Sequence, residues 1–86
     1  MASFRIEWKQ SAKKELRKLP DQARHRILAV VDGLKEDPRP PGSKKLVGIE
    51  QTYRIRVGDY RVIYSFHAPE LCVEIIRVAD RKVVYR

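Results

Sequence analysis

The sequence predicts an α+β fold in which two N-terminal helices pack on one face of a mostly antiparallel four-stranded sheet. Apolar and polar residues alternate near the N-terminus and again in three runs after residue 51, which is typical of strands. Between these regions, apolar residues recur at helical spacing. The predicted order is β-α-α-β-β-β. Because the helices precede an antiparallel meander, we expect both to cover the same sheet face and to leave the other face open.

The N-terminal half contains the first strand and both predicted helices. Strict alternation predicts a strand over residues 3–8. Ser11 is expected to cap a short basic helix that ends before Pro20, because proline disfavours helical geometry in the residue before it. Asp21 is expected to cap a second helix that ends near Glu36. Its apolar stripe consists of Ala23, Ile27, Val30, Val31 and Leu34.

A proline-rich segment separates the helices from the remaining strands. Residues 37–43, DPRPPGS, cannot continue a helix, because proline removes backbone donors and glycine favours turns. Three further strands follow, over TYRIRV, YRVIYSFH and LCVEIIRVA, and they are joined by short turns. Trp8, Tyr60, Tyr64 and Phe66 are expected to pack in the core.

The two-residue turn Gly58-Asp59 makes the pairing of its flanking strands predictable. It places Val57 opposite Tyr60, Arg56 opposite Arg61, Ile55 opposite Val62 and Arg54 opposite Ile63. Arg54, Arg56 and Arg61 should therefore share the sheet face that the helices leave open. Directly opposed like charges destabilise a sheet, so these arginines are either screened by carboxylates or used to bind an anion. Phosphate suits the planar fork of a guanidinium, and the alternative is a solvated basic surface.

Composition agrees with a polyanionic or acidic partner. The chain has 86 residues, with 19 Lys and Arg against 11 Asp and Glu, for a formal net charge of +8. Scattered surface lysines that aid solubility are the alternative explanation of this charge. The length suits one domain over residues 1–86 with an open site.

The lone cysteine and the hydropathy pattern suggest a cytoplasmic protein. Cys72 cannot form an intramolecular disulfide, and its apolar neighbours indicate a core position. No apolar stretch approaches the ~20 residues that a membrane-spanning helix needs, so we expect no membrane association and no signal peptide.

Other candidate functional residues lie at the C-terminus and at two histidines. Arg81, Lys82, Tyr85 and Arg86 follow the last predicted strand, where a tyrosine among arginines can stack on a base or move a proton. His25 is predicted to lie opposite the apolar stripe of the second helix, and His67 at a strand end, so neither is expected to be catalytic.

Three motifs together resemble the RelE/ParE toxin superfamily, and the RelE branch is the closer match. They are Lys45-Leu46-x-Gly48, YRIRVGDYRVIY over residues 53–64 and VADRKVVYR over residues 78–86. The resemblance spans nearly the whole chain. It implies a ribosome-dependent endoribonuclease that cuts mRNA in the decoding site and is neutralised by a cognate antitoxin in a tight complex. It also implies that operator DNA is contacted only indirectly, through the antitoxin.

Carried over motif by motif, the resemblance implies a catalytic set of arginines and one tyrosine: Arg54, Arg56, Arg61, Arg81 and Tyr85. Lys44, Lys45, Lys82 and Arg86 are expected to bind RNA phosphates. The 2′-hydroxyl of RNA supplies the nucleophile, so no metal or other cofactor is expected, and the arginines would stabilise the charge on the phosphorane.

Two other function classes remain open at this point. A ParE-like inhibitor of DNA gyrase would share the fold and act by binding, although it generally lacks the late Arg and Tyr. A non-enzymatic nucleic-acid-binding module would also use the +8 charge, but its activity should survive Arg81→Ala with uniformly weaker, salt-dependent binding.

Overall fold

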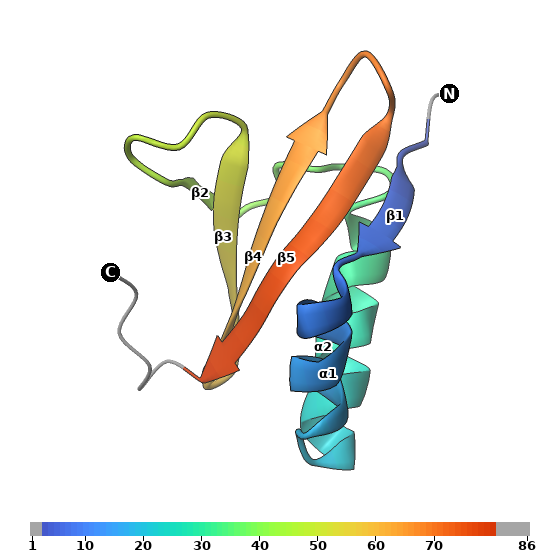
Figure 1. The fold of residues 1–86 in the computed structure, drawn as a ribbon, viewed down its shortest axis with the longest axis vertical. Coiled ribbons are helices and arrows are strands. Elements are labelled where there is room, and N and C mark those ends of the chain that lie inside the picture. Colours follow the sequence, from blue (N-terminus) through green and yellow to red (C-terminus); the bar gives the residue numbers. More distant parts are fainter. Residues whose placement is uncertain (1–2, 81–86) are drawn as a thin grey trace.

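The computed structural model describes residues 3–80 and contains two helices and five strands (Figure 1). In chain order these are β1 (Arg5–Trp8), α1 (Gln10–Arg17), α2 (Asp21–Gly33), β2 (Lys44–Lys45), β3 (Thr52–Val57), β4 (Tyr60–His67) and β5 (Cys72–Asp80).

The strands form one mixed sheet in the order β1-β5-β4-β3-β2. β1 is parallel to β5, and the other neighbouring pairs are antiparallel. The prediction of four strands was therefore wrong, because it missed β2. This strand has only two residues, Lys44 and Lys45, and a two-residue strand carries no alternation that sequence analysis can detect.

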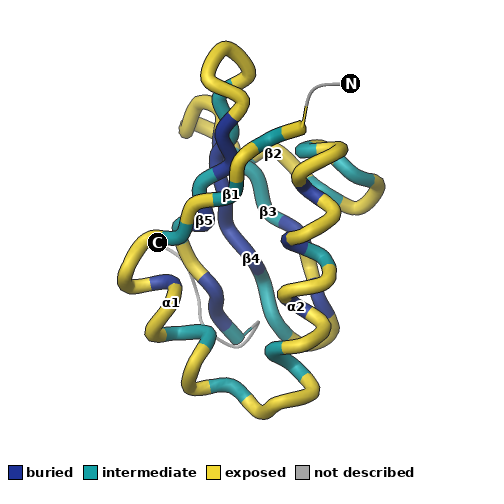
Figure 2. The backbone as a smooth tube through the Cα atoms, turned by 90° about the vertical axis from the view of Figure 1, so that its right-hand side faces the viewer, coloured by how far each residue is buried: buried dark blue, intermediate teal, exposed yellow. Residues whose placement is uncertain are grey.

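Both helices cover the same face of the sheet, as predicted. The views in Figures 1 and 2 place α1 and α2 in one layer, with α1 packed against β5 and α2 against β3. The core between the layers includes Ile27 and Leu34 from α2, with Val62 and Ile75 from the sheet, all of them fully buried. Neither described helix is long and apolar enough to cross a membrane.

The N-cap residues of both helices, Lys9 and Pro20, precede the predicted capping positions. Helix α1 starts at Gln10 and α2 at Asp21, and neither preceding residue, Lys9 or Pro20, makes a side-chain capping hydrogen bond. The predicted caps at Ser11 and Asp21 were therefore wrong. At the start of α2, Pro20 has no N–H that needs an acceptor, and the acidic first residue, Asp21, interacts favourably with the helix dipole.

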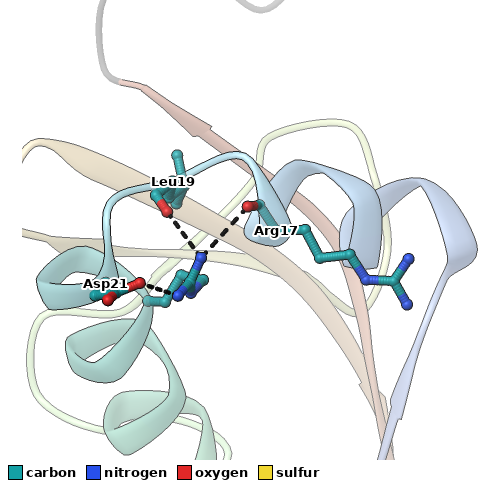
Figure 3. Close-up of polar contacts among 4 residues, drawn as sticks. Arg17, Leu19 and Asp21 are labelled. Atoms are coloured by element: carbon teal, nitrogen blue, oxygen red, sulfur yellow. Dashed lines mark hydrogen bonds and ion pairs between the residues drawn. The ribbon is translucent and has the colours of Figure 1, made fainter.

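Arg24 holds the turn between the two helices (Figure 3). Its guanidinium donates to the carbonyl oxygens of Arg17 (3.4 Å) and Leu19 (3.2 Å) and forms an ion pair with Asp21. These contacts satisfy backbone acceptors at the end of α1 that have no partner within the helix. The short connection from α1 to α2 is thus fixed by one side chain.

The proline-rich segment 37–43 is tied to the sheet through Tyr64. This residue is fully buried, and its hydroxyl donates to the carbonyl oxygen of Pro38 at 2.7 Å. Tyr53 stacks on Tyr64, with ring centroids 6.0 Å apart, and lies 5.0 Å from the ring of Phe66. This aromatic group fixes the chain just before β2 begins.

Candidate functional site

The β3–β4 hairpin aligns the arginines as the sequence predicted. Gly58 has a φ of 61°, a conformation that suits the first central position of a two-residue turn. The observed register pairs Arg56 with Arg61 and Arg54 with Ile63. Because paired residues in antiparallel strands share a face, all three arginines lie on the face away from the helices.

Strand β2 adds one lysine to this surface and leaves the other out. Lys44 pairs with Arg54 and so lies on the same face. Lys45 pairs with Tyr53, whose parity is that of the helix-covered face, so the structure separates Lys45 from the arginines. We call Lys44, Arg54, Arg56 and Arg61 the basic sheet face.

Arg61 is the most constrained member of the basic sheet face. Arg56 is exposed, whereas Arg54 and Arg61 are half-buried. The Nε atom of Arg61 is buried and has no hydrogen-bond partner among residues 3–80. A buried donor without an acceptor is costly, and a guanidinium donates best to an oxyanion. Because Arg61 is only half-buried and shares the open sheet face with Arg56, its guanidinium is suited to an anion that approaches this face.

A pocket of about 500 Å³ lies beside the basic sheet face at the edge of β3. It forms where β3 extends past the two residues of β2. Three of the residues that line it are Lys44, Arg54 and Arg56. Val30 of α2 and Ile55 provide the apolar side. The pocket is open to solvent on one side, as expected for a small domain without a deep cavity.

Sequence analysis missed Arg77 and its partner Glu15. Arg77 pairs with Ile63, which places it in the same row across the sheet as Arg54, next to a β-bulge in β5. Its Nε lies 3.4 Å from a carboxylate oxygen of Glu15 on α1, and the other carboxylate oxygen accepts the backbone N–H of Val78 at 2.8 Å. Glu15 thus supplies an acceptor beyond the end of β1, where β5 has no neighbouring strand. No local pattern could have revealed a contact across 62 or 63 residues.

The histidines lie away from the basic sheet face. His25 is exposed on α2, in the helix layer. His67 lies six residues along β4 from Arg61, which corresponds to about 20 Å. Among residues 3–80 no group of three or more His, Cys, Asp or Glu residues could hold a metal ion.

Cys72 occupies the buried position that the sequence predicted. Its side chain is 7% exposed, and its sulfur lies 3.4 Å from a carboxylate oxygen of Glu7. Burial raises the pKa of this thiol, and the contact with Glu7 raises it further. Because the thiolate is the nucleophilic form, Cys72 is unsuited to catalysis at neutral pH.

The predicted C-terminal site residues, Arg81, Lys82, Tyr85 and Arg86, lie outside the described residues. The last described part of β5 nevertheless runs beside the basic sheet face, since Ala79 pairs with Arg61 and Asp80 with Tyr60. Arg81 is only two residues beyond Ala79 in the chain.

Comparison with known proteins assigns the chain to a family. Residues 6–85 match the family model described as the ParE toxin of the type II toxin-antitoxin system parDE. The chain belongs to the RelE/ParE toxin family. Its curated relatives bear the RelE name. It is 32% identical over 77 residues to the toxin RelE of Mycobacterium tuberculosis, covering 88% of this chain and 79% of that protein. It is also 27% identical over 86 residues to a putative toxin RelE1 of Methanocaldococcus jannaschii, covering 96% of each.

Solved structures of RelE toxins have the same fold. RelE in the archaeal RelE–RelB complex of Pyrococcus horikoshii superposes with a TM-score of 0.84 at 31% identity, over 95% of this chain and 99% of that one. The isolated RelE toxin of Escherichia coli gives a TM-score of 0.81 at 27% identity, over 96% and 88% of the two chains. The resemblance to the RelE branch noted in the sequence is thereby confirmed.

Proposed function

We propose that this RelE-family protein, as a single toxin domain over residues 1–86, is a ribosome-dependent endoribonuclease that cuts mRNA in the decoding site. The observation that carries the proposal is the basic sheet face, where Arg56 and Arg61 are directly opposed and the buried Nε of Arg61 has no acceptor among the described residues. Repulsion between the two arginines is unfavourable in the free protein and is relieved by a bound phosphate.

The chemistry needs no nucleophile from the protein. The 2′-hydroxyl of the RNA attacks the adjacent phosphorus, the P–O5′ bond breaks, and a 2′,3′-cyclic phosphate and a 5′-hydroxyl result. Arginine stays protonated at neutral pH, so Arg54, Arg56 and Arg61 stabilise the negative charge of the phosphorane rather than act as bases. Lys44 provides a further cation for the flanking phosphate, and neither a metal nor a cofactor has a role in these steps.

Arg81 and Tyr85 complete the proposed site. Arg81 follows Ala79, the partner of Arg61, by two residues in the chain. It is assigned to clamping the phosphate or assisting the leaving group. Tyr85 is assigned to proton handling or to stacking on a base, and Lys82 and Arg86 to binding phosphates at the edge of the site. Lys45 is left out of the proposed site, because it has the parity of the helix-covered face.

A cognate antitoxin is the proposed protein partner. Support comes from the solved RelE–RelB complex of P. horikoshii and the intact RelBE complex of E. coli, both of which match this chain. An acidic or amphipathic antitoxin segment would screen the arginines of the basic sheet face and add buried apolar area. The toxin then contacts operator DNA only through the antitoxin, and it acts in the cytoplasm, where ribosomes are.

Cleavage of mRNA in a translating extract tests the proposal, with 5′ ends mapped relative to the decoding site. Arg61→Ala should lower kcat by about 10²–10³-fold, because it removes a donor that acts on the transition state. Arg61→Lys keeps the charge but loses the Nε donor, and should retain more activity than Arg61→Ala. Lys35→Ala, at an exposed lysine in the turn after α2, is the control for loss of a surface cation and should cut like the parent.

The alternatives give different results in the same experiment. A gyrase inhibitor would leave mRNA intact and block DNA supercoiling instead. A binding module would slow translation without new 5′ ends, and Arg61→Ala would only weaken its affinity. Either outcome would refute the nuclease proposal. Efficient cutting of purified RNA without ribosomes would refute the ribosome dependence alone.

A further inference from the structure

The proposed cleavage steps assign no part of the RNA to the pocket at the edge of β3, although this pocket lies beside the arginines assigned to the phosphate. We call it the β3 edge pocket. Its volume is about 500 Å³, and the residues that line it are Val30, Pro41, Gly42, Lys44, Arg54, Ile55 and Arg56. Small-molecule sites are typically roughly 300–1,000 Å³ in volume, so the pocket can take one flat ring system.

The pocket exists because β2 pairs with only the first part of β3 (Figure 1). The last pair on this edge is Lys44 with Arg54, and continuation of the ladder would have brought Gly42 opposite Arg56. Instead, the chain turns away. Gly42 has a φ of 94°, which glycine adopts readily, and the backbone N–H of Ser43 donates to the carbonyl oxygen of Pro40 at 3.0 Å. The edge of β3 beyond Arg54 is therefore left uncovered by β2.

The backbone groups of Arg56 face this uncovered edge. The carbonyl oxygen of Thr52 accepts a hydrogen bond from Leu46, on the β2 side of β3. Hydrogen-bonding groups alternate between the two neighbours of an antiparallel strand, so Arg54 and Arg56 direct theirs to the same side as Thr52. Among residues 3–80, β2 pairs with this edge only as far as Arg54. One N–H donor and one C=O acceptor of Arg56 thus face the β3 edge pocket.

The remaining surface of the pocket combines apolar groups with cations. Ile55 is buried, Val30 of α2 is half-buried, and Pro41 lies in the exposed segment before β2. Lys44 and Arg54 supply positive charge at the same pocket. A nucleotide has matching features, because its base has apolar faces and an edge of donors and acceptors, and its phosphate is an anion.

A peptide strand fits this edge less well than a base does. Strand addition pairs several residues of the incoming peptide with the main chain of the edge strand. Here β2 pairs with β3 as far as Arg54, and the β3–β4 turn begins at Gly58. Between these two positions, Arg56 is the one residue whose backbone groups face the edge. A single donor and a single acceptor suit the edge of one base.

We propose that the β3 edge pocket binds a nucleobase of the mRNA next to the phosphate that is cut, and so selects where the RNA is cleaved. The inference rests on the proposed function and deepens it, because it names the part of the substrate that the protein itself recognises. The base hydrogen-bonds to the main chain of Arg56 and packs against Val30 and Pro41. Recognition by main-chain groups does not depend on the arginine charges, so base preference and phosphate binding are separable.

The test fills the pocket from α2 with Val30→Phe. The matched control is Leu28→Phe, two residues earlier on the same helix, where the side chain is 44% exposed and does not line this pocket. The four nucleoside 3′-monophosphates and inorganic phosphate are each titrated into the isotope-labelled protein, and the amide signal of Arg56 is followed by NMR. The parent and Leu28→Phe should bind one nucleotide about tenfold more tightly than the others. Val30→Phe should bind all four as weakly as inorganic phosphate.

Cleavage on ribosomes provides the second measurement, with mRNAs that differ in one nucleotide flanking the cut. The parent should prefer the same base by about tenfold in kcat/KM, and Val30→Phe should reduce the preference to within about twofold without lowering kcat for the disfavoured bases. If circular dichroism shows that Val30→Phe does not fold like the parent, Pro41→Phe fills the pocket from its exposed side instead.

Equal affinity of the parent for the four nucleotides, or binding no tighter than that of inorganic phosphate, would overturn the inference. A base preference that survives in the pocket-filling variant would overturn it too, as would a response of Arg56 to the antitoxin but to none of the nucleotides. If the parent shows the expected nucleotide preference but cuts no mRNA, the proposed function fails while the assignment of a base to the pocket is supported.

Discussion

Tyr64→Phe isolates the link between the proline-rich segment and the sheet. At neutral pH the substitution removes a hydrogen bond of 2.7 Å to the Pro38 carbonyl oxygen and should lower the free energy of unfolding by about 1 kcal/mol. Burial raises the pKa of Tyr64 from 10.0 to about 12, so the folded state favours the neutral phenol. This contribution is fully present below pH 10 and is lost as the pH rises from 10 through about 12, because the unfolded chain releases the proton first.

The shift of about two pH units corresponds to about 2–3 kcal/mol at its limit. The advantage of the parent over Tyr64→Phe should therefore shrink above pH 10 and reverse at about pH 10.7, after which the variant is the more stable protein. Urea unfolding followed by circular dichroism at intervals from pH 7 to 11.5 measures this difference. Tyr60→Phe, at the half-buried start of the same strand, is the control for loss of a hydroxyl. A parent–variant difference that stays constant from pH 9 to 11.5 would refute the assignment.

Three further substitutions or reactions test individual contacts. Arg56→Gln should raise the free energy of unfolding by about 0.2–1 kcal/mol at low salt, since it removes the charge opposite Arg61, and urea titrations should show that gain vanish in about 1 M salt. The same variant should cut less mRNA. Glu15→Ala should cost about 1–3 kcal/mol by leaving the Val78 N–H and Arg77 without this carboxylate, whereas Glu15→Gln, which keeps an acceptor, should cost less; amide exchange at Val78 reports the lost acceptor. Cys72 should react with a thiol reagent at neutral pH only as fast as the protein opens, because the group is buried and its pKa is raised; rapid labelling of the native protein would contradict this.

Local signals in the sequence were enough to predict most of the fold. A two-residue turn leaves one register for its hairpin, so the pairing of Arg56 with Arg61 followed from Gly58-Asp59 alone. Helical periodicity and proline punctuation likewise placed both helices. Strand β2 and the first residues of the helices were mispredicted because the local sequence carries no signal for either of them. A strand of two residues exists only through its pairing with β3, and the helices begin without the side-chain caps that a sequence displays.

The candidate site was predictable where it depends on strand parity, and not where it depends on contacts between distant segments. Parity alone placed Arg54, Arg56 and Arg61 on one face. The separation of Lys44 from Lys45 follows only from the register of β2. Glu15 was predicted merely as part of a basic helix, although it is the residue that joins α1 to the end of β5.

The placement of the arginines explains why such a small protein would depend on its partners. A helix layer on one face supplies the core (Figure 1), and the uncovered face is free to carry opposed guanidinium groups that a packed interface could not accommodate without anions. Each phosphate or carboxylate that binds there relieves repulsion already present in the free fold, so binding and stability are linked. RNA and an acidic antitoxin segment would both be attracted to the cations of the basic sheet face, and for that reason they should compete for it. Under the proposed function, the antitoxin would neutralise the toxin by covering the basic sheet face, without distorting the fold that presents it.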